Sequence, residues 1–126
     1  MEAAEKRMYP RLCLTLQDGY FGHFILPNQE RLIASIVNMS AGGINLSMAE
    51  KSKDAVQEGE ILLLRNIVGG ANLSFISDIR GEVRWIKQLD SGSLSVGCRF
   101  VALAEDQIQQ LIRFVHTERM ARGQYN

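Results

Sequence analysis

The stretch that decides the fold is residues 81–100, GEVRWIKQLDSGSLSVGCRF. Apolar and polar residues alternate on both sides of a turn cluster, Asp-Ser-Gly-Ser at 90–93. Alternation with a period of two is typical of half-buried strands, and a short turn cluster between two such runs indicates a β-hairpin. Trp85 has the same phase as Val83 and is therefore predicted in the core. The pattern gives each strand one inward face: Ile79, Gly81, Val83 and Trp85 in the first, and Leu94, Val96, Cys98 and Phe100 in the second.

More strands are predicted on the N-terminal side of this hairpin. They alternate in polarity or are rich in β-branched residues, and clusters of Gly, Pro or polar residues separate them. A polar segment, AEKSKDAVQEGE at 49–60, is predicted as a loop. The predicted strands are RLCLTL at 11–16, FGHFILPN at 21–28, RLIASIVNMS at 31–40, GINLSM at 43–48 with Ile44, Leu46 and Met48 inward, and EILLLRNIV at 60–68.

The C-terminal part of the chain changes period. Ile108, Leu111, Ile112 and Val115 follow the spacing i, i+3, i+4, i+7, which predicts an amphipathic helix. Many short strands followed by one helix favour an all-β dominated fold, a small antiparallel barrel whose closure removes exposed strand edges. The helix is expected to cover one opening or one face of that barrel.

Length and composition are those of one ordinary globular domain. The chain has 126 residues, of which 46% are hydrophobic and 22% charged. We expect a flexible lead at 1–6, the barrel with its closing helix at 7–120, and a tail at 121–126. The 14 basic and 14 acidic residues cancel. A protein that coats a nucleic acid usually has a basic excess, so any anion site in this chain must be local.

The N-terminal residues, the lack of a long apolar stretch and the two cysteines indicate the cellular compartment. The N-terminal residues carry charges and no apolar signal-peptide core, and no stretch approaches the roughly 18 apolar residues of a membrane span. Cys13 and Cys98 lie far apart, each in an apolar segment, and are predicted to be buried free thiols rather than a disulfide. These features predict a cytoplasmic protein without membrane insertion.

The sequence contains no motif that would carry catalysis or hold a metal. Its two histidines, His23 and His116, belong to no HExxH or other ligand spacing, and no CxxC pair occurs. The glycine pairs lack the lysine of a phosphate-binding P-loop. We therefore predict no catalytic residues, no metal and no cofactor.

Two short elements have the chemistry of a binding site. The first is RMYPR, residues 7–11, in which Arg7 and Arg11 lie just ahead of the first predicted strand. Pro10 disfavours a helix there, so the two guanidinium groups can approach a ligand from different sides. Guanidinium suits phosphate oxygens and also the O6/N7 edge of guanine. Taken alone, a solvated basic segment is the simpler interpretation.

The second element is NMSAGGINLSM, residues 38–48. Asn38 and Ser40 are two positions apart at a strand end, where alternation would place them on one face. Gly43 would let a flat or anionic ligand approach the backbone. The alternative is a plain turn between strands, in which Asn and Ser make local hydrogen bonds.

In their order, RxxxR, a strand and then NxSxxG, these elements resemble the PilZ domain family, receptors for the bacterial second messenger cyclic di-GMP. GEVRWI and VGCRF resemble the family's paired strands, so the resemblance covers roughly residues 7 to 116. It implies a six-stranded antiparallel β-barrel with a C-terminal α-helix and ligand binding without catalysis, here in a stand-alone single-domain member. The matching motif positions are Arg7, Arg11, Asn38, Ser40 and Gly43.

The resemblance also implies a role for each matching residue. Arg7 and Arg11 would clamp the guanine edge and the phosphates, Asn38 and Ser40 would meet the remaining polar groups, and Gly43 would hold the turn. Lys6 stands where many relatives carry another arginine, which leaves both a single ligand and a stacked pair open. Trp85 could stack on a base, but its phase favours the core. Arg84 and Arg99 are candidates for further phosphate contacts, with solvated strand faces as the alternative.

The expected function is to bind cyclic di-GMP and to relay the signal through a downstream partner protein. One alternative is a PilZ-like adaptor that binds a partner without nucleotide. A second is a small-barrel binder of single-stranded nucleic acid. The zero net charge and the few aromatic residues, 7% of the chain, argue against a nucleic acid polymer as partner.

Overall fold

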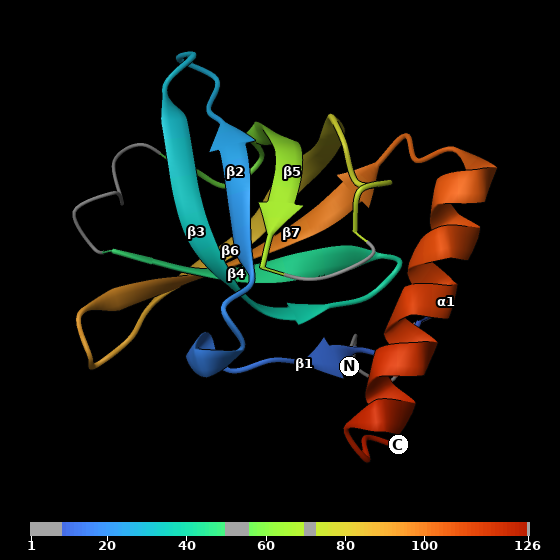
Figure 1. Ribbon diagram of the computed structural model, residues 1–126. Helices are drawn as coiled ribbons and strands as arrows, with labels where there is room; N and C mark the ends of the chain where they lie inside the picture. The colour runs from blue at the N-terminus through green and yellow to red at the C-terminus, as the bar shows by residue number, and fades with distance from the viewer. Residues whose placement is uncertain (1–8, 50–55, 70–72, 126) are drawn as a thin grey trace, which may run out of the picture.

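The structure is a computed structural model and describes residues 9–49, 56–69 and 73–125 (Figure 1). The described part contains seven strands, one short 3-10 helix and one α-helix. Their bounds are β1 Leu12–Cys13, η2 Leu16–Asp18, β2 Phe21–Ile25, β3 Arg31–Met39, β4 Gly43–Ala49, β5 Ile61–Val68, β6 Ile79–Gln88, β7 Ser93–Val101 and α1 Glu105–Ala121.

Six of the strands close into a ring. The order is β3-β2-β5-β6-β7-β4, and β4 pairs back onto β3, with every pairing antiparallel. β1 lies outside the ring, where it pairs with the end of β3. The predicted six-stranded antiparallel barrel is therefore confirmed, with one extra strand on its rim.

The inward faces predicted from alternation fill the barrel. In β4 the inward side chains are Ile44, Leu46 and Met48, and all three are buried. The predicted inward residues of β7, from Leu94 to Phe100, are buried as well. Period-two patterning located these residues correctly because one face of each strand meets the core and the other meets solvent.

Trp85 corrects the predicted core. The register of β6 against β7 shifts between Val83 and Trp85, where Arg84 forms a β-bulge. A bulge adds one residue to one strand and so reverses the phase of the side chains that follow it. Val83 is buried, but Trp85 is 39% exposed on the outer surface, and Ile86 packs against the core instead. The prediction that Trp85 belongs to the core was wrong.

The first predicted strand is shorter than the sequence pattern indicates. Leu12 and Leu14 are buried as expected, but β1 stops at Cys13, and Leu16 is 63% exposed in η2. The Asp18 carboxylate accepts the backbone N–H of Thr15 at 2.7 Å, which starts this short helical turn where alternation predicted more strand.

The two cysteines differ in exposure, which corrects the prediction of two buried thiols. Cys13 is exposed and Cys98 is buried, and burial raises the pKa of the Cys98 thiol to about 12. We therefore expect a thiol reagent such as DTNB to modify one thiol per native chain at neutral pH and two after denaturation. Cys13→Ser should then abolish labelling of the native protein, whereas rapid modification of this variant would show that Cys98 is accessible.

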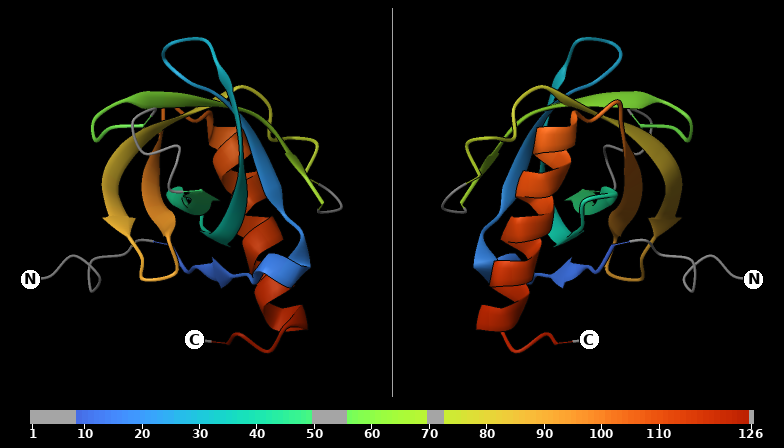
Figure 2. Two further views of the ribbon diagram at one scale, coloured as in Figure 1. Left: turned by 90° about the vertical axis from the view of Figure 1, so that its left-hand side faces the viewer. Right: turned by 90° about the vertical axis from the view of Figure 1, so that its right-hand side faces the viewer.

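α1 lies across one end of the barrel (Figure 2). Leu111 and Val115 on its inner side are buried in the core, as the spacing predicted. Past the helix, the Gln124 side chain makes two hydrogen bonds with the backbone of Cys13, at 2.9 and 3.0 Å. The C-terminal residues thus cover the outer edge of β1.

A second link joins the end of α1 to η2. Arg122 donates to Asp18 at 2.9 Å and to Glu118 at 3.3 Å. The Thr15 N–H and then Arg122 lower the pKa of Asp18 below its ordinary value of 3.8. A carboxyl with a lowered folded pKa stabilises the fold above its unfolded pKa, and this stabilisation is lost as pH falls through the folded value.

We therefore expect Asp18→Asn to melt below wild type at pH 6. The difference should shrink as the pH falls below 3.8, because the wild-type carboxyl then becomes protonated and loses its charge as well. Thermal melts of both proteins between pH 2.5 and 7 would measure it. A gap of constant size across this range would mean that the charge of Asp18 contributes nothing.

Candidate functional site

The turn between β3 and β4 is held by its own polar groups. The Ser40 N–H donates to the Gly43 carbonyl at 2.9 Å, and the Gly42 N–H donates to Ser40 Oγ at 3.0 Å. The Phe100 N–H donates to the Gly42 carbonyl at 3.0 Å and ties the turn to β7. The turn is therefore rigid, and the Ser40 hydroxyl supports it directly.

Gly43 is required by a close approach of two backbones. β4 pairs with β7 so that Gly43 faces Arg99, and a Cβ on Gly43 would lie 2.2 Å from the carbonyl oxygen of Cys98. No side chain fits at that distance, and the obstacle is backbone that cannot rotate away. The glycine keeps the turn pressed against β7 and leaves the backbone uncovered at this point.

Arg11 meets Asn38 across the rim of the barrel. β1 pairs with the end of β3, with Cys13 opposite Asn38, and this register brings the residue two before Cys13 next to the Asn38 side chain. Arg11 Nη1 donates to Asn38 Oδ1 at 2.8 Å. Two predicted site residues that are 27 positions apart in sequence are thus directly bonded.

Tyr9 extends this contact over the turn. A Cβ on Gly42 would lie 3.4 Å from the Tyr9 ring, so the ring sits directly against the turn. Arg7 and the predicted lead at 1–6 lie outside the described residues. The described end of the arginine segment, residues 9–11, is packed on the site.

A surface groove of about 680 Å³ contains most of these residues. Its walls are the turn after β3, the outer faces of β6 and β7, and the segment before β1. Asn38 is not part of the wall and reaches the groove through Arg11. β3 ends at Met39, so Ser40 belongs to the turn rather than to the strand face predicted for it. The polar and aromatic lining residues include Tyr9, Arg11, Ser40, Arg84, Trp85 and Arg99.

The groove is positively charged although the chain as a whole is neutral. Arg11, Arg84 and Arg99 line it, and none of the described lining residues is acidic. Glu82 lies beside the groove and pairs with Arg99 at 3.0 Å and with Arg84 at 3.6 Å. Both arginines are more than half exposed, and exposed ion pairs contribute little, so they can exchange Glu82 for a ligand anion at small cost.

Trp85 is the groove residue that periodicity missed. It lies opposite Gly97 of β7, and a Cβ on Gly97 would be 2.2 Å from the indole ring, so the ring lies flat against the sheet. A flat, exposed indole is suited to stacking on a planar ligand. Gly97 was the only sequence signal for an outward Trp85, because a glycine opposite leaves room for the indole on the sheet surface. That signal can be recognised only when the bulged register, which pairs Gly97 with Trp85, is known.

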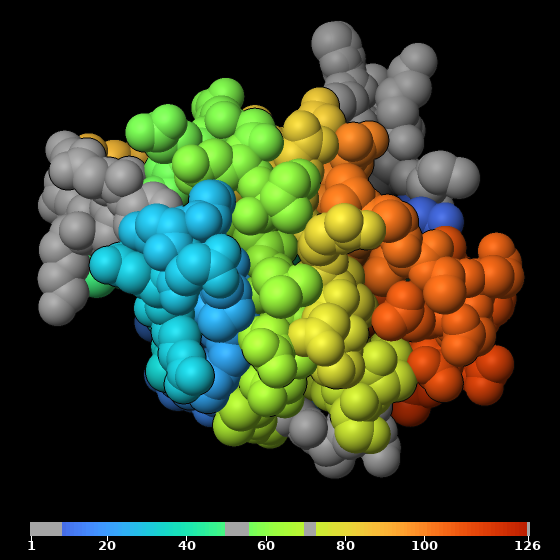
Figure 3. All heavy atoms as spheres, turned by 90° about the horizontal axis from the view of Figure 1, so that it is seen from above, coloured from blue at the N-terminus to red at the C-terminus, as the bar shows by residue number. Residues whose placement is uncertain are grey.

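A second hollow of about 680 Å³ lies between β2, β3, β5 and residues 73–77. It belongs to the side of the barrel on which β2 and β5 lie next to each other (Figure 3). Its lining contains none of the predicted site residues that the structure describes. Two arginines line it. Arg65 forms an ion pair with Asp78 at 2.7 Å, and Arg31 is the exposed first residue of β3. Equal volume does not make the two hollows equal sites, because only the first combines three arginines, an exposed indole and uncovered backbone.

In the part of the chain described, six strands close into a β-barrel whose surface carries a groove lined by three arginines and an exposed tryptophan. A family model for the PilZ domain matches residues 5–117, so this chain belongs to the PilZ family. PilZ domains are receptors for cyclic di-GMP rather than enzymes. The resemblance inferred from the sequence is confirmed.

Solved structures share the fold. The PilZ domain of YcgR from Escherichia coli, solved with c-di-GMP, is 20% identical, with a TM-score of 0.71 over 94% of this chain and 96% of that one. MrkH of K. pneumonia in complex with c-di-GMP is 18% identical with a TM-score of 0.74, and MotI/DgrA of Bacillus subtilis is 20% identical with a TM-score of 0.68. These two matches cover 95% and 92% of this chain but only 55% of the MrkH chain and 52% of the MotI/DgrA chain.

No match was found among curated protein sequences. In the described part of the chain, α1 included, no helix has the length and apolar character needed to cross a membrane.

Proposed function

We propose that this chain binds cyclic di-GMP in the groove between the β3–β4 turn and β7, with Arg7, Arg11, Asn38, Ser40 and Gly43 as the binding residues. The observation that carries the proposal is the bond between Arg11 and Asn38 at the rim of this groove. It joins the two sequence motifs, and the register of β1 on β3 fixes it. Structures of the same fold solved with c-di-GMP support this choice of ligand.

The chemistry of the ligand suits the walls of the groove. Cyclic di-GMP has two phosphates and two guanine bases. Arg11 offers a planar fork for the O6/N7 edge of a guanine or for phosphate oxygens, and Arg7 would approach from the other side of the clamp. Arg84 and Arg99 supply further positive charge, and Trp85 offers a stacking surface.

Asn38 and the turn would act mainly by positioning. The Asn38 side-chain oxygen accepts from Arg11 Nη1 and so orients the guanidinium at the rim of the groove. Ser40 is 4% exposed, and its hydroxyl already holds the turn through the Gly42 N–H. We infer that Ser40 and Gly43 shape the floor of the groove and bring backbone groups close to the ligand.

The bound state would then be relayed to a partner protein, because the proposed role of the domain is binding rather than catalysis. The groove involves residues 9–11, the β3–β4 turn and the start of α1, so a ligand there would change the surface that these segments present. Binding of the partner protein to that surface is a property distinct from nucleotide binding.

Trp85 provides the experiment that tests nucleotide binding. It is the single tryptophan of the chain and lines the groove, so its fluorescence reports on that surface alone. Titration with cyclic di-GMP should change the emission saturably, and equal concentrations of GMP should change it far less. An unchanged spectrum with both nucleotides would argue against a ligand that stacks on Trp85.

A further inference from the structure

A small pocket lies between α1 and the segment before β1, next to the nucleotide groove. Its volume is about 180 Å³, roughly a quarter of the groove, which suits one side chain rather than a nucleotide. The lining residues are Tyr9, Pro10, Ala41, Ile112, Val115, His116 and Arg119.

Arg119 is the unusual member of this pocket. It is 7% exposed, and its Nε–H is fully buried without an acceptor. Across residues 9–49, 56–69 and 73–125, the side chain of Arg119 has no hydrogen bond or ion pair. The next arginine along the helix, Arg122, takes the carboxylates of both Asp18 and Glu118. Burying this N–H without an acceptor is costly, so the pocket lacks a partner for Arg119 among the described residues.

The other residues that line the pocket indicate which chemical group could pair with Arg119. They are apolar except for His116 and the Tyr9 hydroxyl, and none of the lining residues is acidic. A guanidinium that is surrounded by apolar surface pairs best with a carboxylate, which accepts two parallel N–H bonds in a geometry that matches its fork. The missing group is therefore a carboxylate.

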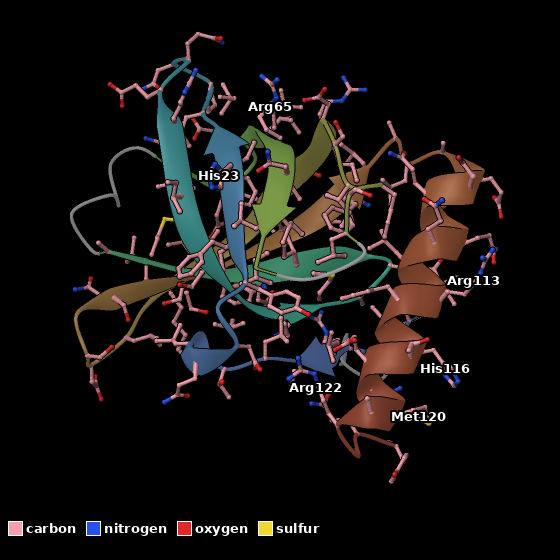
Figure 4. All side chains as sticks on the ribbon, viewed as in Figure 1. His23, Arg65, Arg113, His116, Met120 and Arg122 are labelled. Atoms are coloured by element: carbon pink, nitrogen blue, oxygen red, sulfur yellow. The ribbon has the colours of Figure 1, made fainter. Side chains whose placement is uncertain are left out.

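The surface around the pocket indicates a protein as the source of that carboxylate. Ile112 and Met120 are 36% and 37% exposed on α1, one turn to either side of His116. Figure 4 shows His116 and Met120 projecting from the outer side of the helix, away from the barrel. A charged pocket flanked by exposed apolar side chains is the arrangement of a protein interface, in which an anchored polar group is surrounded by apolar contact.

We infer that this pocket receives an Asp or Glu side chain of a partner protein, whose adjacent apolar residues pack on Ile112 and Met120. The inference deepens the relay part of the proposed function. Tyr9 and Ala41 line both the pocket and the nucleotide groove. A partner seated in the pocket therefore touches the same two residues as the nucleotide, so occupancy of one site changes the affinity of the other.

The test uses the Nε–Hε signal of Arg119 in two-dimensional ¹⁵N–¹H NMR of the nucleotide-free full chain. The probe is the blocked dipeptide acetyl-Glu-Leu-amide, with acetyl-Gln-Leu-amide as the uncharged match and acetate as the free carboxylate. We expect the Glu peptide to shift the signal saturably, the Gln peptide to leave it in place, and acetate to bind more weakly. No shift with the Glu peptide overturns the pocket, and acetate binding as tight as the peptide overturns a protein source.

Two variants of α1 separate binding from stability. Arg119→Gln should lower the affinity for the Glu peptide at least about tenfold, as expected for loss of a charge-assisted pair. Arg113→Gln removes the same charge from an exposed position of the helix and should leave peptide affinity within about twofold. Arg119→Met should melt at or above wild type, because it removes an unpaired buried charge. A large loss of stability would make Arg119 a structural residue and overturn the inference.

The relay is tested by repeating the titration with the protein saturated by cyclic di-GMP. A changed affinity for the Glu peptide supports it, and identical affinities overturn the relay. The peptide titration that tests the pocket uses the nucleotide-free chain. Its result therefore stands even if the chain fails to bind cyclic di-GMP.

Discussion

Arg11→Ala is expected to weaken cyclic di-GMP binding by about five- to a hundredfold or more. A bidentate guanidinium contact to guanine contributes roughly 1–3 kcal/mol, and about 1.4 kcal/mol corresponds to a factor of ten. Arg11→Lys should restore little, because an ammonium supplies charge but not the planar fork that Asn38 holds in place. Calorimetry on wild type and both variants measures the difference.

The same change should also lower the stability of the fold. Arg11 is half-buried and donates to Asn38, so its loss removes at least this charge-assisted hydrogen bond and should lower the free energy of unfolding by roughly 1–3 kcal/mol. Arg31→Ala is a matched control, since Arg31 is exposed at the opposite end of β3 and does not line the groove. If Arg11→Ala binds as tightly as wild type and Arg31→Ala, the clamp assignment is wrong.

Gly43→Ala should destabilise the whole barrel. The added methyl group would lie 2.2 Å from the Cys98 carbonyl oxygen, so β4 and β7 must separate where the turn is anchored. Forced overpacking of this kind costs typically 1–3 kcal/mol, and here the obstacle is backbone rather than a side chain that can rotate. We expect a clear fall in melting temperature together with weaker cyclic di-GMP binding, because the displaced turn forms the floor of the groove.

Gly42→Ala is the neighbouring control for this effect. A Cβ on Gly42 comes no closer than 3.4 Å to the Tyr9 ring, an ordinary contact, so this variant should keep nearly the wild-type melting temperature. Equal melting temperatures for Gly42→Ala and Gly43→Ala would contradict the claim that the approach to Cys98 requires glycine at position 43.

The barrel could be predicted from the sequence because alternation and turn residues report local physics. The inward faces of β4 and β7 follow from a period of two, and α1 follows from a period of 3.6. Closure into six strands came from the resemblance to the PilZ family, since strand pairing across the barrel leaves no mark in a single sequence.

The details that escaped prediction depend on long-range register. The bulge at Arg84 turns Trp85 from the core to the groove, and nothing in the local alternation signals one extra residue in β6. The Asp18 carboxylate accepts the Thr15 N–H and starts η2 where alternation predicted more strand. The contact between Arg11 and Asn38 requires the pairing of β1 with β3, which no local pattern specifies.

The partner pocket was equally invisible in the sequence. In the sequence, Arg119 is an ordinary basic residue near the end of an amphipathic helix, where a cation suits the macrodipole. Its burial arises from the segment at 9–10 lying against α1, more than a hundred positions away in the chain. A periodic pattern assigns a residue to a face of a helix but does not say what lies opposite that face.

The central claim is that the groove binds cyclic di-GMP, and calorimetric titration of the wild-type chain with this nucleotide tests it most directly. We predict a saturable heat at micromolar ligand that weakens as salt is added, because charge attraction to two phosphates contributes to the affinity. The double variant Arg7→Ala, Arg11→Ala should show no such heat while remaining folded. A folded wild-type chain that gives no heat with cyclic di-GMP at low salt would contradict the claim and favour an adaptor that binds its partner without nucleotide.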